Sequence, residues 1–222
     1  MLHEVINRSP KSVVYLHGFA SDPQSIKAQY FARLLAPLPF VAPDLNQPDF
    51  PSITVSRMAD AAGAALVSAA APVALFGSSM GGYAATLAAQ RHPDRVGALI
   101  LFAPAFDLDA LWHSRLTEAQ RAAWQATDHL PVGDEHPRGH PAYLRYTIFE
   151  DAVRLRSEAL RAVVPTLIFH GAADTTVPLL SSEAFAARES EVELVVFAGA
   201  EHGLNDKLEI MGERVQRFLF GH

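Results

Sequence analysis

The sequence predicts an α/β fold, with a doubly wound, mostly parallel sheet that carries helices on both faces. Short segments rich in Val, Leu, Ile and Phe alternate with longer segments of helical character. Nearly uninterrupted apolar segments are typical of parallel strands that are covered on both sides. The alternation also implies right-handed crossovers between the strands. Half of the 222 residues are apolar, so we expect one domain, residues 1–222, with a large core.

Six segments are expected to form the strands, because each is short and almost entirely apolar. They are residues 12–18, 40–45, 73–77, 97–104, 166–171 and 192–199. The segments between and after them are longer and have helical character. The helices are expected at residues 25–38, 56–70, 82–92, 179–190 and 208–220.

One long segment, about residues 107–161, interrupts this alternation. It contains helical pieces and a loop at 130–141, but no strand signal. Thr117 and Gln120 have the spacing of a capping box. Long insertions in compact sheet proteins are usually functional, so we expect a helical lid, with a structural decoration as the alternative.

Composition and charge narrow the class of protein. The net charge is −6 and no basic cluster occurs, which argues against a nucleic-acid partner. The chain has no cysteine, so disulfides and cysteine-bound zinc are excluded. The first residues lack a signal-peptide pattern, and no apolar stretch reaches the ~18 residues of a membrane span. We therefore expect a cytoplasmic protein with no membrane partner.

The segment GSSMG, residues 77–81, fits the G-x-S-x-G pattern with Ser79 at its centre. In this pattern a serine occupies a sharp, strained turn between a strand and a helix, and small neighbours leave room for the turn. Ser78 does not fit, because Phe76 takes the place of the first glycine. The alternative is a glycine-rich turn that only packs a helix against a strand.

A nucleophilic serine needs a base, and the base needs an orienting acid. In this architecture they follow the serine in the order Asp or Glu, then His. Asp174 follows the strand expected at 166–171, and His202 follows the next one. Asp107 is the rival acid, and the order along the chain favours Asp174. The predicted catalytic residues are Ser79, Asp174 and His202.

Acyl transfer also needs donors for an oxyanion. The backbone N–H of Met80, directly after the serine, is the first candidate, and that of Phe19, after His17–Gly18, is the second. His17 and His170 are expected to have supporting roles. The loop histidines His136 and His140, beside two acidic residues, are interpreted as solvated rather than as metal ligands.

Taken together, the segments HGF (17–19), GSSMGG (77–82), HGAADTTVP (170–178) and AEHG (200–203) resemble the α/β-hydrolase superfamily. The start of the chain resembles small bacterial YqiA-type esterases. The middle is also similar to the acyl-glucuronide and palmitoyl-thioester hydrolases. The resemblance implies a serine hydrolase of carboxylic esters or thioesters that uses no cofactor and no metal, with a small-molecule substrate as its partner.

The insertion is expected to select the substrate, since the catalytic parts are generic. Its apolar residues, Trp112 and Trp124 above all, are predicted to form an apolar wall for the substrate. Two alternatives remain open at this stage. The same triad could act on peptides, carbon–carbon bonds or peracids, or the chain could be a binding protein that does not catalyse.

Overall fold

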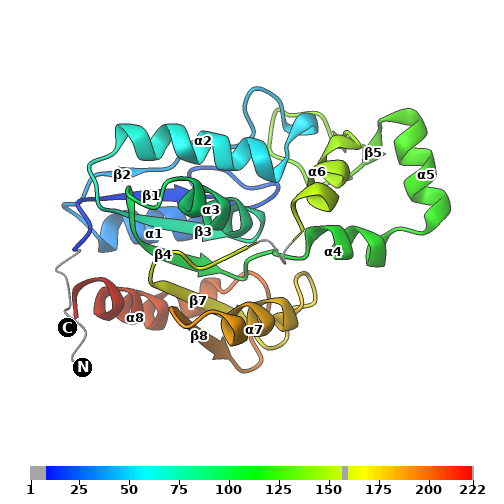
Figure 1. Cartoon of the computed structure of the whole chain (residues 1–222). Helices are drawn as coiled ribbons and strands as arrows, with labels where there is room; N and C mark the ends of the chain where they lie inside the picture. The colour runs from blue at the N-terminus through cyan, green and yellow to red at the C-terminus, as the bar shows by residue number, and fades with distance from the viewer. Residues whose placement is uncertain (1–8, 157–159, 222) are drawn as a thin grey trace.

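The computed structural model describes residues 9–156 and 160–221. Its centre is a six-stranded sheet in the order β2-β1-β3-β4-β7-β8, and every neighbouring pair is parallel (Figure 1). The expected α/β, doubly wound fold is confirmed. The strands are β1 (Ser12–Leu16), β2 (Phe40–Val41), β3 (Val73–Ser78), β4 (Val96–Phe102), β7 (Thr166–Gly171) and β8 (Val192–Phe197).

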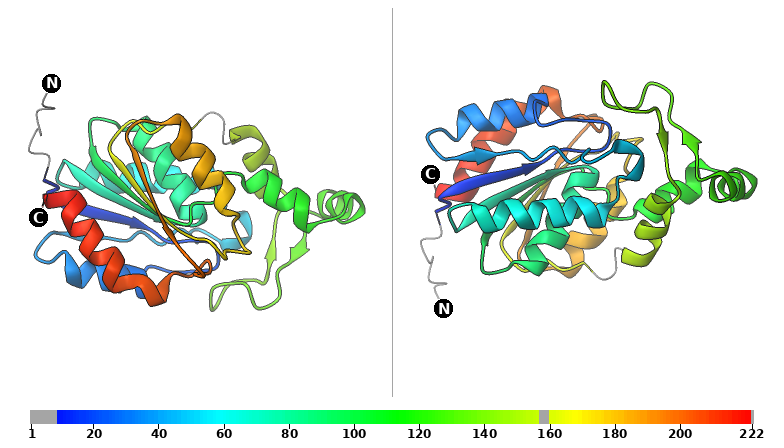
Figure 2. Two further views of the ribbon diagram at one scale, coloured as in Figure 1. Left: turned by 90° about the horizontal axis from the view of Figure 1, so that it is seen from below. Right: turned by 90° about the horizontal axis from the view of Figure 1, so that it is seen from above.

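Helices cover both faces of the sheet because successive strand side chains point to opposite sides. On β1, Val14 joins one apolar core with helices α2, α3 and α7, whereas Val13 joins the other with α1 and α8. The two helix layers are visible in Figure 2. The helices are α1 (Ile26–Leu34), α2 (Val55–Ser68), α3 (Met80–Arg91), α7 (Leu179–Arg188) and α8 (Leu208–Phe220).

The insertion between β4 and β7 lies beyond the carboxyl ends of the strands, at the end of the molecule away from the termini (Figure 1). It contains α4 (Leu108–Arg115), α5 (Glu118–Thr127), the strand pair β5 (Leu130–Pro131) and β6 (Tyr143–Leu144), and α6 (Thr147–Leu155). The predicted capping box of Thr117 and Gln120 is confirmed at the start of α5. The antiparallel pair β5–β6 was not predicted, because two-residue strands that include a proline carry no periodic signal.

The insertion is tied to the segment after β2 by hydrogen bonds to the backbone. Asp151 of α6, which is 8% exposed, accepts a hydrogen bond from the Ser56 backbone N–H at 2.9 Å. The Arg145 backbone N–H donates to the Pro51 carbonyl at 2.9 Å, within the short 3₁₀ helix η1 (Phe50–Ser52). These contacts hold the insertion over one end of the sheet. None of the helices in the described ranges is long and apolar enough to cross a membrane.

Candidate active site

Ser79 stands between the end of β3 and the start of α3, in a conformation that side chains rarely adopt. Its φ is 53° and its ψ is −120°. Such a backbone costs about 1–3 kcal/mol and persists only where the surrounding structure enforces it. Here the Ser79 N–H donates to the Phe102 carbonyl at 2.8 Å, and the Ser79 carbonyl accepts from Ala105 N–H at 3.1 Å. The strained turn predicted from GSSMG is present.

The glycines on either side of Ser79 are required by close backbone approaches. A Cβ atom on Gly77 would lie 2.5 Å from the carbonyl oxygen of Gly81. A Cβ atom on Gly81 would lie 2.5 Å from the carbonyl oxygen of Leu16 on β1. The turn can therefore pack against the sheet only with glycine at both positions.

Asp174 and His202 are brought together from the loops after β7 and β8. The His202 Nδ1 atom lies 2.7 Å from Asp174 Oδ2. The other carboxylate oxygen accepts hydrogen bonds from the N–H groups of Thr176 and Val177, both at 2.8 Å. With the proton on Nδ1, the Nε2 atom of His202 is free to accept a proton. Asp174, rather than its rival Asp107, is the carboxylate bonded to this imidazole.

The Asp174 carboxyl group is held in its charged form. Its side chain is fully buried, which alone would raise its pKa. Hydrogen bonds from His170, His202 and the Val177 N–H outweigh burial and hold the pKa of Asp174 well below its ordinary value. The carboxylate of Asp174 therefore carries its negative charge directly beside the His202 ring.

His170 supports this arrangement from below, as a buried side chain on β7. Its Nε2 atom lies 3.0 Å from the Val177 carbonyl and 3.3 Å from Asp174 Oδ2. Its Nδ1 atom lies 2.8 Å from Ser182 Oγ on α7. His170 thus fixes the loop that carries the acid, which agrees with its expected supporting role.

His17 also has a structural role at the end of β1. It is fully buried, and its Nε2 atom accepts the Leu45 N–H at 3.0 Å. Burial lowers the pKa of His17, so its neutral form is favoured. The loop histidine His136 lies 2.8 Å from the Gly133 carbonyl through Nδ1. No cluster of potential metal ligands occurs among the residues that the structure describes.

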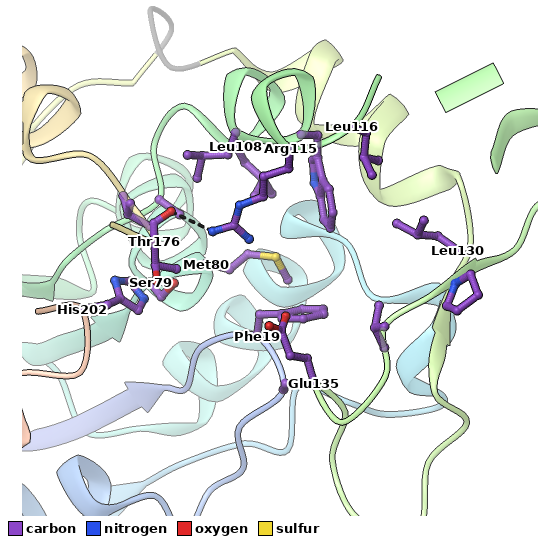
Figure 3. A pocket seen from close by; sticks show the side chains of 17 residues that line it. Phe19, Ser79, Met80, Leu108, Arg115, Leu116, Leu130, Glu135, Thr176 and His202 are labelled. Atoms are coloured by element: carbon purple, nitrogen blue, oxygen red, sulfur yellow. Dashed lines mark hydrogen bonds between the residues drawn. The ribbon is translucent and has the colours of Figure 1, made fainter. Parts of the chain in front are cut away.

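Ser79 and His202 both line a cavity of about 620 Å³ beneath the insertion (Figure 3). Figure 3 shows the His202 ring beside Ser79, with Met80 and Phe19 further along the wall. The other walls are mostly apolar and come from α4, from the segment 130–132 and from the loop after Asp174. We call this space the large cavity.

Phe19 and Met80, the predicted oxyanion donors, flank Ser79 in the large cavity. Met80 is the first residue of α3, so its N–H is one of the helix's unpaired N-terminal donors. Phe19 lies on the loop after β1, and the preceding Gly18 passes so close that a Cβ there would be 3.2 Å from the Ser79 Cβ. Both backbones are therefore adjacent to the serine.

The two tryptophans of the insertion have different positions. Trp112, on α4, lines the large cavity, as predicted. Trp124, on α5, does not line it: the side chain is 1% exposed, and its indole N–H donates to the Leu144 carbonyl at 2.9 Å. It packs against Trp112 with ring centroids 5.3 Å apart. The predicted contact of Trp124 with substrate is thus corrected to a supporting position behind Trp112, because its indole is used to anchor β6.

Two charged residues at the large cavity were not predicted. Arg115, at the end of α4, donates to the Thr176 carbonyl at 3.0 Å, and its guanidinium points into the cavity in Figure 3. Glu135, from the loop after β5, lines the cavity beside Phe19. Neither position belongs to a motif, so only the folded insertion reveals them.

The parallel sheet with a strained serine at the carboxyl end of β3 defines an α/β-hydrolase fold, and comparisons with solved structures agree. A candidate hydrolase from Agrobacterium vitis is 24% identical, with a TM-score of 0.82 over 96% of this chain and 91% of that chain. Mouse alpha/beta hydrolase domain-containing protein 10 is 21% identical, with a TM-score of 0.78 over 94% of this chain and 89% of the mouse chain. Est1E from Butyrivibrio proteoclasticus with bound ferulic acid is 22% identical, with a TM-score of 0.78 over 97% of this chain and 90% of the Est1E chain.

Residues 12–219 match the model of the Uncharacterised protein family (UPF0227), and the chain belongs to this family. A comparison with curated proteins gives no significant match. The solved structures confirm the expected α/β-hydrolase fold over nearly the whole chain.

Proposed function

We propose that this protein is a serine hydrolase that cleaves carboxylic ester or thioester bonds through an acyl-enzyme. The observation that carries the proposal is the 2.7 Å contact between His202 Nδ1 and Asp174 Oδ2, in a cavity that also holds Ser79. Nucleophile, base and acid come from the ends of three strands, in the order typical of this fold.

In the first half of the reaction, Ser79 Oγ attacks the carbonyl carbon while His202 Nε2 takes the hydroxyl proton. Asp174 keeps the proton of the imidazole on Nδ1 and stabilises its positive charge. The tetrahedral intermediate collapses, the bond to the alcohol or thiol breaks, and His202 returns the proton to that leaving group. Water then repeats the attack on the acyl-Ser79 ester and releases the acid.

The negative charge of the tetrahedral intermediate is held by the backbone N–H groups of Phe19 and Met80. Loss of one such donor typically costs about 10²–10³ in rate. Met80 is well suited to this role, because its N–H lies at the positive end of the α3 dipole.

The large cavity is the site for the apolar part of the substrate. Its volume of about 620 Å³ is that of a small-molecule site. Trp112, Leu108 and Leu111 of α4 supply one wall, and Phe19 supplies another. The partner of the site is thus a small ester or thioester with an apolar acyl group.

The nucleophile can be tested with a fluorophosphonate probe, which labels activated serines. We expect labelling of the wild-type protein and of Ser78→Ala, and none of Ser79→Ala, with all three folded by circular dichroism. An unlabelled wild-type protein would favour a non-catalytic binding protein, and label on Ser78 would refute the assignment of the turn.

A substrate panel then tests the bond that is cleaved. It comprises p-nitrophenyl esters of increasing chain length, acyl-CoA thioesters, a feruloyl ester and aminoacyl amides. The feruloyl ester is included because Est1E binds ferulic acid. Hydrolysis of esters or thioesters by wild type and not by Ser79→Ala is expected. Faster cleavage of the amides would contradict ester specificity while leaving the triad in place.

A further inference from the structure

A second cavity, of about 320 Å³, meets the large cavity at Ser79, Phe19 and His202. We call it the small cavity. Apart from the shared residues, its lining comes from β1 and the loop after it, the start of α1, the end of β3 and the turn after His202, and none of it comes from the insertion. Its polar walls are formed by Tyr15, Ser21, Ser25, Lys27, Ser78 and Asn205.

Lys27 places a cation in the wall of the small cavity. The residue is only 9% exposed, yet no carboxylate of the described residues forms a salt bridge with it. Its ammonium donates to the Gly203 carbonyl at 2.5 Å and to Asn205 Oδ1 at 3.4 Å. An ammonium has three donors, so at least one remains for a ligand. Burial lowers the pKa of Lys27 to about 8, so the side chain is still mostly charged at pH 7.

Hydroxyl groups surround the rest of the small cavity. Tyr15, Ser25 and Ser78 all line it, so three hydroxyl-bearing side chains gather around one small space. Ser25 also caps α1 by accepting the Ala28 N–H at 3.4 Å, so the positive end of this helix faces the same space. A buried cation, hydroxyl donors and a helix N-terminus all favour an oxygen-rich anion.

Ser79 and His202 line both cavities, so one cavity can hold the acyl group of a substrate while the other holds its leaving group. The leaving atom must lie within hydrogen-bond reach of His202, which returns the proton to it. Gly203, which follows His202 directly, and Asn205, two residues further on, both accept hydrogen bonds from Lys27. The apolar walls of the large cavity, in contrast, suit the acyl chain.

Resting on the proposed serine-hydrolase function, we infer that the small cavity binds an anionic leaving group, an alcohol or thiol with a carboxylate or phosphate, whose negative charge pairs with the Lys27 ammonium. The substrate then spans Ser79, with its apolar acyl group in the large cavity and its charged group in the small one. Lys27 is a specificity-determining residue that the chemistry itself does not use.

The test compares pairs of esters that differ only in charge. For the leaving group, the pair is the butanoyl ester of 3-hydroxybenzoate and that of 3-hydroxybenzamide, with the butanoyl ester of 3-hydroxyphenyl phosphate as the phosphate arm. For the acyl side, the pair is the phenyl monoester of glutarate and its primary amide. The readout is the ratio of kcat/KM for the charged over the neutral ester in each pair.

For wild type we expect the leaving-group ratio to be about ten or more, the gain of one charge-assisted hydrogen bond. In Lys27→Met the ratio should fall to about one, whereas Lys27→Arg should retain a clear preference. The matched control is Lys207→Met. Lys207 lies on the turn after His202 that also carries Asn205, lines neither cavity, and pairs with Asp206 at 2.7 Å. This variant should keep the wild-type ratio. If Lys27 had only a structural role, its replacement would lower kcat/KM for the charged and the neutral ester alike and leave their ratio unchanged.

Binding provides a readout that does not depend on hydrolysis. In Ser79→Ala, 3-hydroxybenzoate should bind about tenfold more tightly than 3-hydroxybenzamide, and the additional change Lys27→Met should remove the difference. A wild-type ratio near one, a ratio that survives Lys27→Met, or a preference only on the acyl side would each overturn the inference. Absence of any ester hydrolysis, with Ser79 unlabelled, would instead overturn the proposed function, even if the anion binds.

Discussion

Replacement of Asp174 by asparagine tests the triad with almost no change in shape. In the wild-type protein one carboxylate oxygen accepts the N–H groups of Thr176 and Val177, both at 2.8 Å, and the other faces His202 Nδ1 at 2.7 Å. The amide oxygen of asparagine can keep the two backbone bonds. Its NH₂ group must then point at His202.

An NH₂ group in that position donates to Nδ1, so it favours the imidazole tautomer that has its proton on Nε2. That tautomer cannot accept the proton of Ser79. In another serine hydrolase the same change lowers kcat by about 10⁴, which corresponds to roughly 5.4 kcal/mol at about 1.36 kcal/mol per factor of ten. We expect a loss of this order here. Loss of the negative charge beside the imidazolium acts in the same direction.

The assay is steady-state hydrolysis of p-nitrophenyl butanoate, together with the rate of fluorophosphonate labelling of Ser79. Asp107→Asn is the matched control, since Asp107 was the rival acid and lies at the start of α4. It should retain activity within about tenfold of wild type. The reasoning would be refuted if Asp174→Asn kept more than a tenth of the wild-type kcat, or if Asp107→Asn lost as much.

Three further predictions concern the insertion and the effect of pH. Trp112→Ala should shift the acyl chain-length preference measured by kcat/KM, because each methylene buried against the wall contributes about 0.8 kcal/mol. Trp124→Ala should instead lower the unfolding midpoint, since removal of a buried Trp costs about 3–5 kcal/mol; superimposable chain-length profiles for Trp112→Ala and wild type would contradict the first expectation. The preference for anionic leaving groups should decline as the pH rises through about 8. Burial lowers the pKa of Lys27 to about 8, so the fraction of Lys27 that is positively charged falls over this range. Tyr15 and His202 also line this cavity, and burial raises the pKa of Tyr15. The variant Lys27→Arg identifies the titrating group, because arginine stays charged over this range. If Lys27 is that group, the ratio in Lys27→Arg should not change with pH.

The fold and the placement of the three predicted catalytic side chains follow closely from local sequence patterns. The segments expected at 166–171 and 208–220 coincide with β7 and α8. Uninterrupted apolar strands indicate a parallel sheet that is covered on both faces, and the carboxyl ends of parallel strands lie along one edge of the sheet. That edge is why residues as distant as Ser79 and His202 could be paired before the fold was known.

The insertion was less predictable, because its structure depends on contacts with distant residues. Trp124 and Trp112 have the same residue type and similar surroundings in sequence. Only the bond from the Trp124 indole to Leu144 decides which of them is buried behind the other. β2 also proved far shorter than the expected segment 40–45, since an edge strand with one neighbour is limited by the length of its pairing with β1.

Lys27 carried no signal in the sequence for a different reason. In α1 it sits between exposed and apolar positions, where a lysine normally extends into solvent. Its burial arises from the turn after β8, whose Gly203 carbonyl lies 176 residues away along the chain. Long-range contacts of this kind are invisible to helical periodicity.

The meeting of two cavities at Ser79 has a consequence for the second half of the proposed reaction. If the leaving group departs from the small cavity, that space becomes open to solvent while the acyl chain still fills the large one. The hydrolytic water can then reach the acyl-Ser79 ester from the side where His202 acts as base, without displacement of the bound chain. The same route admits any other small nucleophile. We therefore expect added alcohols to intercept the acyl-enzyme and yield new esters, with charged alcohols such as hydroxy acids the most efficient acceptors.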